Sequence, residues 1–99
     1  MITIEDVKRF AKEHPIGNGG KVTLIENNAV KISIVGGASG LYGDFEKDFE
    51  IAIIDQLTGD FITKFFIPEA NDDVVGYMSG PELEKVINSI IKDKDFQVR

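Results

Sequence analysis

The sequence predicts an α+β fold, in which a four-stranded and mainly antiparallel sheet is flanked by one helix at each end of the chain. Three observations support this class. Apolar residues recur at helical spacing only near the two ends, whereas the middle is rich in β-branched residues. Asparagine and glycine turns divide this middle part into consecutive hairpins. Strands and helices do not alternate as a parallel sheet requires, so the expected order is α-β-β-β-β-α.

The first helix is expected to begin at Thr3. This residue and Asp6 have the spacing of a capping box with an acidic partner. Apolar side chains then recur on one helical face, and Pro15 makes His14 the expected last helical residue, after about three turns. The glycine-rich residues 16–20 follow as a flexible connection.

Residues 21–35 are expected to form the first hairpin. β-branched residues flank the pair Asn27-Asn28, and asparagine tolerates the positive φ of a two-residue turn. In this register Ile25 faces Val30, and alternate side chains point to the core. The side chains expected on the core face are Lys21, Thr23, Ile25, Val30, Ile32 and Ile34.

The second hairpin is expected over residues 45–55 and 61–67, after a loop at residues 36–43 that contains four glycines. Residues 56–59 form its turn, in which Gly59 supplies the left-handed conformation. The two hairpins complete the four strands, and the two helices can cover one face of the sheet. The other face is then left to water or to a partner.

The last helix is expected after a brief extended segment, residues 74–78. Ser79 and Glu82 repeat the capping-box spacing, and an apolar stripe at i, i+3, i+4, i+7 and i+8 follows. The tail, residues 92–99, either frays or adds a short edge strand. The stripe consists of Leu83, Val86, Ile87, Ile90 and Ile91.

The whole chain, residues 1–99, is expected to form one domain, because 99 residues are too few for two independent cores. It has no cysteine, which excludes disulfides, thiolate metal sites and thiol nucleophiles. Its longest apolar run is four residues, Ile51 to Ile54, and it shows no signal-peptide pattern. A cytoplasmic protein without membrane contact is the expectation.

Negative charge is concentrated in one third of the sequence. Between Asp44 and Asp73 lie nine acids and two bases, a net charge of −7, within a chain whose total is −6. Direct binding to nucleic acid is therefore disfavoured. Four of these acids alternate with other residues along the expected third strand and would project from one sheet face as a row. They are Asp44, Glu46, Asp48 and Glu50.

This row suggests a small, non-enzymatic binding or regulatory protein, a monomer or homodimer, that docks on a basic protein surface, including as an inhibitor that mimics nucleic-acid phosphates. Asp72 and Asp73 would extend the row, and Leu41 and Tyr42 in the glycine loop would act as a binding finger. The competing interpretation is that the acids only solvate one sheet face. The partner-binding residues are thus Asp44, Glu46, Asp48, Glu50, Asp72, Asp73, Leu41 and Tyr42.

Two other function classes remain open at the level of sequence. The protein is either an assembly component that packs through an exposed sheet face and an apolar helix, or a small metal-dependent enzyme. The alternating acids imitate a calcium loop, but Phe49 occupies the position where that loop requires glycine. The lone His14 lies at a helix end, and no serine has a nucleophile motif around it. No catalytic residue, metal ligand or cofactor is predicted.

Overall fold

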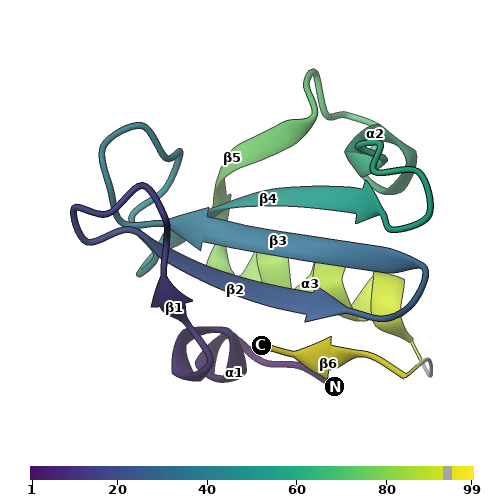
Figure 1. The fold of residues 1–99 in the computed structure, drawn as a ribbon, viewed down its shortest axis with the longest axis horizontal. Helices are drawn as coiled ribbons and strands as arrows, with labels where there is room; N and C mark the ends of the chain where they lie inside the picture. Colours follow the sequence, from purple (N-terminus) through teal and green to yellow (C-terminus); the bar gives the residue numbers. More distant parts are fainter. Residues whose placement is uncertain (93–94) are drawn as a thin grey trace.

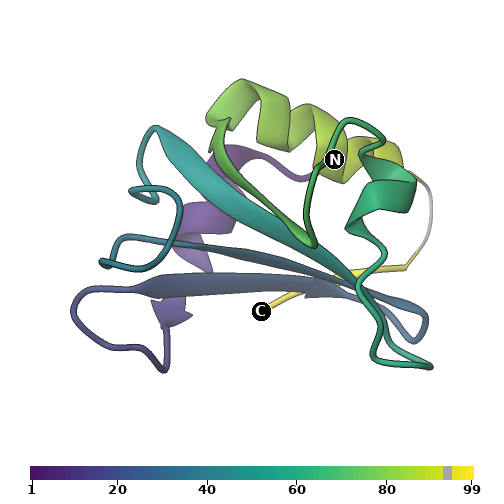
Figure 2. The ribbon, with the colours of Figure 1, turned by 90° about the horizontal axis from the view of Figure 1, so that it is seen from above.

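A computed structural model describes residues 1–92 and 95–99 and shows an α+β protein built on an antiparallel sheet of six strands. Five strands lie in the order β1-β2-β3-β4-β5, and β6 also pairs with β2. Helices α1 and α3 lie on the same face of this sheet (Figure 2), and Figure 1 looks onto the other face. The predicted class is confirmed, but the four-strand order α-β-β-β-β-α is wrong.

The described residues contain three helices and six strands. The helices are α1 (Ile4–Arg9), α2 (Thr63–Phe66) and α3 (Gly80–Ile91). The strands are β1 (Lys12–Glu13), β2 (Lys21–Glu26), β3 (Val30–Gly36), β4 (Asp48–Asp55), β5 (Val74–Ser79) and β6 (Gln97–Val98). None of the helices in this part of the chain is long and apolar enough to cross a membrane.

Helix α1 begins as predicted but is shorter. The Thr3 hydroxyl accepts a hydrogen bond from the Asp6 backbone N–H, and the Thr3 N–H donates to the Asp6 carboxylate, which completes the capping box. These bonds from Thr3 lower the pKa of Asp6 below its ordinary value. The helix ends at Arg9, because the next residues form β1 along the edge of β2. Strand pairing thus overrides the helical periodicity that pointed to His14.

The first hairpin is confirmed, with its register displaced by two residues. Ile25 pairs with Ile32 rather than Val30. The Asn27 side-chain oxygen accepts from the backbone N–H groups of Ala29 and Val30, which moves the turn to residues 28–29. A shift of two residues leaves every side chain on its face. Thr23, Ile25, Ile32 and Ile34 are accordingly all fully buried.

The second hairpin is wrong. Its turn forms as predicted, since the Asp55 N–H donates to the Asp60 carbonyl at 2.8 Å and Gly59 has φ +80°. After it, however, only Phe61 bridges to β4, and the chain turns into helix α2. The Thr63 hydroxyl accepts from the Ile53 N–H at 2.9 Å and donates to the Asp73 carbonyl at 2.6 Å. This buried side chain thereby takes the place of a strand pairing.

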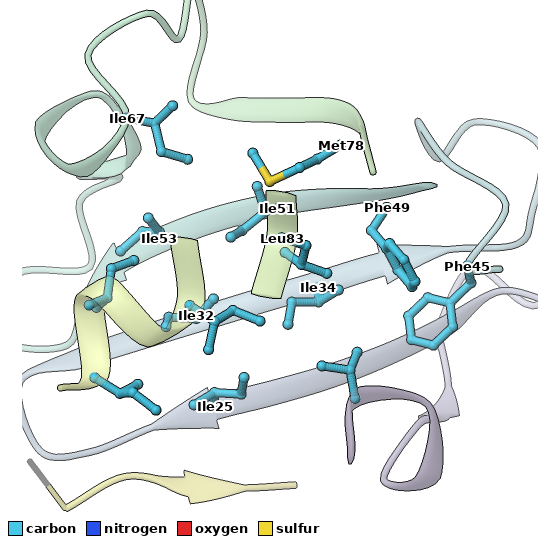
Figure 3. Close-up of a cluster of buried hydrophobic side chains, with 14 residues drawn as sticks. Ile25, Ile32, Ile34, Phe45, Phe49, Ile51, Ile53, Ile67, Met78 and Leu83 are labelled. Atoms are coloured by element: carbon cyan, nitrogen blue, oxygen red, sulfur yellow. The ribbon is translucent and has the colours of Figure 1, made fainter. Parts of the chain in front are cut away.

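The end of the chain follows the prediction. Segment 74–78 becomes β5 beside β4, and Ser79 caps α3 through the Glu82 N–H. The stripe of α3 packs on the sheet, as does Phe45 from the loop before β4 (Figure 3). Of the tail, β6 confirms the edge-strand alternative, whereas residues 93–94 lie outside the described residues.

The second face of the sheet carries no helix, and we call it the helix-free face. Its side chains alternate with the buried ones along β2, β3 and β4. Leu24 and Ile54 on this face are half-buried, and Val35 and Ala52 are buried. The helices cover one face of the sheet, as the sequence suggested, and the second face carries these apolar side chains together with charged ones such as Glu26, Lys31 and Glu50.

Candidate functional site

The predicted row of four acids is broken in the structure, because strand β4 begins only at Asp48. Asp44 and Glu46 lie in the preceding turn. Phe45 between them has a left-handed backbone, φ +62°, and its ring is turned into the core, where it meets Phe49 edge-on with 5.2 Å between ring centroids (Figure 3). The alternation of acids and apolar residues thus reflects a tight turn with one buried anchor. We call residues 44–48 the acidic turn.

Asp44 organises the acidic turn. One of its carboxylate oxygens accepts the backbone N–H groups of Glu46 and Lys47 at 2.8 Å and of Asp48 at 3.2 Å. These backbone hydrogen bonds, that of Glu46 first, lower the pKa of Asp44 from its ordinary value of 3.8 to about 2. The carboxylate therefore stays ionised and is held in one orientation.

The other three acids also make specific contacts. The Asp48 carboxylate accepts the Asp44 N–H at 2.8 Å, and the Glu50 carboxylate accepts the Tyr42 N–H at 2.9 Å. Glu46 is exposed, with 72% of its side chain accessible, and forms an ion pair of 3.5 Å with Lys8. The donors to Asp48 and Glu50 are neutral peptide groups, so these bonds fix both carboxylates without neutralising their charge.

Tyr42 meets Tyr77 beside the acidic turn. The Tyr77 N–H donates to the Tyr42 carbonyl at 2.8 Å, and the two ring centroids lie 6.1 Å apart with the planes tilted by 49°. Both rings face solvent, at 51% exposure for Tyr42 and 68% for Tyr77. Leu41, the other predicted finger residue, is half-buried. We use the name tyrosine corner for Tyr42, Glu50, Gly76 and Tyr77; it does not denote the Greek-key motif of the same name.

A bulge in β5 creates the tyrosine corner. The register of β4 with β5 shifts between Phe49 and Ile51, so that Gly76 and Tyr77 both lie opposite Glu50. Tyr77 has φ +53°, a conformation that non-glycine residues seldom adopt. A Cβ atom on Gly76 would overlap the Cβ of Tyr42, so only glycine lets the loop approach the strand this closely.

Tyr77 and Gly76 were missed at the sequence level. The signal was a glycine within the apolar segment 74–78, because glycine inside a strand often marks a bulge or a close backbone approach. Nothing in the local sequence indicated that Tyr42, 34 residues before Gly76, would fill that space.

Asp72 and Asp73 do not continue the acidic turn. They immediately precede β5, at the end where Val74 pairs with Ala52, whereas Asp48 pairs with Ser79 at the other end. Both side chains are exposed. The structure thus separates the predicted row into one group at the tyrosine corner and a second group about the length of a strand away.

The tyrosine corner lines none of the three main cavities. Two of them, of about 350 and 300 Å³, lie around Phe96 near the turn between β2 and β3, and the third, of about 580 Å³, lies along α3 beside Pro81 and Val86. Within residues 1–92 and 95–99, no group of three or more histidine or acidic side chains is arranged to hold a metal ion. What the corner offers is aromatic surface and fixed negative charge.

The chain was compared with protein-family models, with curated protein sequences and with solved structures, and none of them matches it. No family is therefore assigned. The function is inferred from the geometry of the tyrosine corner and the acidic turn.

Proposed function

We propose that this protein is a non-enzymatic binding module that docks the tyrosine corner and the acidic turn onto a basic surface of another protein. The observation that carries the proposal is the pair of exposed rings, Tyr42 and Tyr77, held beside carboxylates by backbone hydrogen bonds. Tyrosine is enriched among the residues that dominate binding energy at protein interfaces. An exposed aromatic surface that lines none of the cavities suits a protein partner better than a small molecule.

Charge supports a basic partner. In the described part of the chain the only ion pairs are Lys8–Glu46 and Arg9–Asp6, so Asp44, Asp48 and Glu50 have no cationic side chain within 4.0 Å. An arginine or lysine of the partner can lie over a tyrosine ring while its charge meets these carboxylates, which combines a cation–π contact with ion pairing. The surrounding negative field would also accelerate the encounter.

Rigidity adds to the case. The Tyr42 backbone is bonded on one side to Glu50 and on the other to Tyr77. Asp44 in turn holds three consecutive N–H groups of the neighbouring turn. A surface that is ordered before binding loses little conformational entropy on association. The strained φ of Tyr77 is the kind of local cost that proteins retain at functional positions.

The test uses intrinsic tyrosine fluorescence, because Tyr42 and Tyr77 are the only two tyrosines and the chain has no tryptophan. Titration with a six-arginine peptide at low salt is expected to give a saturable change in this signal. Changing the acids of the acidic turn and of the tyrosine corner to amides keeps the oxygen acceptors while removing the charge. This change should weaken the affinity for the peptide at least fivefold. The variant carries Asp44→Asn, Glu46→Gln, Asp48→Asn and Glu50→Gln.

The matched control removes the same four charges elsewhere on the surface and should change the affinity less than twofold. If control and corner variants weaken binding equally, only net charge matters and the proposed site is wrong. Tyr77→Ala should also weaken binding, through loss of one ring. The control carries Glu5→Gln, Glu13→Gln, Asp60→Asn and Glu69→Gln, all at exposed positions.

Mimicry of nucleic-acid phosphates is the finer form of this proposal. It requires that the basic partner use the same surface for nucleic acid and for this protein. A partner retained through the tyrosine corner should then be released by a short DNA or RNA duplex at micromolar concentration. Release by salt alone, with no competition from either duplex, would support docking on a basic surface but exclude the mimic.

A further inference from the structure

We infer that the helix-free face binds a second copy of this chain. The strand register defines how its side chains are arranged, because residues paired across antiparallel strands point to the same face. Three rows cross the sheet from the edge formed by β1 and β6 toward β4 and β5. The first row contains Lys12, Val22, Val35 and Glu50, the second contains Arg99, Leu24, Ser33, Ala52 and Val74, and the third contains Gln97, Glu26, Lys31 and Ile54.

Opposite charges lie on matching strands of this face. In the first row Lys12 is exposed on β1 and Glu50 lies on β4, with two valines between them. In the third row Glu26 on β2 lies beside Lys31 on β3. The second row has small or apolar side chains apart from Arg99 at its edge. Reversing the order of strands β1 to β4 therefore places Lys12 over Glu50 and Lys31 over Glu26.

This pattern is complementary to itself in only one orientation. A twofold axis that runs parallel to the strands, between two facing sheets, lays each row over the same row of the second copy in the reverse direction. With this axis between β2 and β3, Lys12 meets Glu50 of the second copy, Glu26 meets Lys31, and each pair forms twice. An axis perpendicular to the strands would instead bring the two basic edges together. The favoured arrangement is that of two aligned sheets packed about 10 Å apart.

The size of the face predicts a weak dimer. Five strands about 4.8 Å apart and roughly six paired residues long present on the order of 400 Å² per copy, which is below the ~800 Å² per partner of a standard interface. The net charge of −6 on each copy also opposes association. A dimer in exchange with monomer at high micromolar concentration is the expected state.

Sedimentation equilibrium across ~10 µM to ~1 mM at physiological salt tests this inference. The weight-average mass should rise with concentration from the monomer value of 10.9 kDa toward twice that value. Reversing the basic edge with Lys12→Glu and Arg99→Glu should abolish the rise. Reversing two exposed lysines on the helices, Lys64→Glu and Lys85→Glu, changes the net charge equally and should reduce it far less.

A second variant, Leu24→Thr, removes apolar surface from the middle of the face and retains a residue suited to a strand. It should weaken dimerisation at least threefold while its circular dichroism stays that of the native fold. A constant mass of 10.9 kDa at all concentrations would overturn the inference. So would equal loss of dimer in both charge-reversed variants, because the association would then not depend on this face. Glu50 belongs both to this face and to the tyrosine corner, so peptide binding is measured at ~10 µM, where the chain is expected to be monomeric, and is then a separate result.

Discussion

Asp44 shows how a single side chain changes the meaning of a sequence pattern. The alternation of acids around Phe45 suggested a strand with a charged face. A carboxylate followed by free N–H groups two, three and four residues later can equally close a turn, and this is what Asp44 does. The two alternatives were not distinguishable from alternation alone, since the deciding feature is the core contact of Phe45.

The lowered pKa of Asp44 predicts a pH dependence of stability. Because folding lowers this pKa from 3.8 to about 2, the ionised carboxylate stabilises the folded state above about pH 4. This contribution is lost as the pH falls toward 2. Urea unfolding of the native protein and of Asp44→Asn should therefore show a stability difference that is constant near pH 6 and shrinks toward pH 2.

Asp60→Asn provides the control for this experiment, since Asp60 is an exposed acid in a different turn. It should leave the unfolding free energy near that of the native protein throughout. The role assigned to Asp44 is wrong if its variant loses stability with falling pH as steeply as the native chain. A titration of the Asp44 carboxyl by NMR would give the same answer directly.

At the level of elements, the sequence was most informative where one helix or hairpin is stabilised by its own pattern. The stripe of α3 and its Ser79 cap were predictable because a helix records its buried face at fixed spacing. Helix α2 was not predictable, because it depends on long-range hydrogen bonds. Thr63 bonds both β4 and the residue before β5, and these partners are brought together only in the folded chain. The β5 bulge has the same character, since its cause is Tyr42 in a distant loop.

The bulge gives a prediction for Gly76→Ala. The added methyl group would overlap Tyr42, so the glycine loop must move away from β5, at a cost of about 1–3 kcal/mol in the free energy of unfolding. The aromatic NMR signals of Tyr42 and Tyr77 should shift, and binding of the arginine peptide should weaken. Urea denaturation and peptide titration on the same sample measure both effects.

Gly59→Ala distinguishes loss of stability from loss of the tyrosine corner. Gly59 also requires glycine for its backbone, with φ +80°, but no atom lies within 4 Å of the position of its missing Cβ. We expect it to cost about 1 kcal/mol through strain alone and to leave the tyrosine signals unchanged. Similar tyrosine shifts in both variants would show that Gly76 has no specific role in shaping the corner.

For the whole molecule, closure depends on contacts between the two ends of the chain. The Ile2 backbone donates to and accepts from the Asn88 side-chain amide of α3, both at 2.8 Å, and the Ile4 N–H donates to the Glu84 carboxylate at 3.0 Å. Strand β6 lies on the same edge of β2 as β1. Strands β1 and β6 therefore share one edge of the sheet, and short-range patterns gave no sign of these contacts because their partners lie at opposite ends of the chain.

This long-range closure makes Asn88→Ala the most informative single change for the fold. It removes both hydrogen bonds to Ile2 at a half-buried position and is expected to cost about 2 kcal/mol of unfolding free energy. Ser89→Ala, at the adjacent exposed position, should remain within about 0.5 kcal/mol of the native protein. Because Asn88 links the segment before α1 to α3 and not to the sheet, amide exchange should accelerate first at Val7 and only later at Ile32. Equal acceleration at both positions would mean that the N-terminal segment and the sheet unfold as one unit. Asn88 would then stabilise the whole core and not only the attachment of the N-terminal segment to α3.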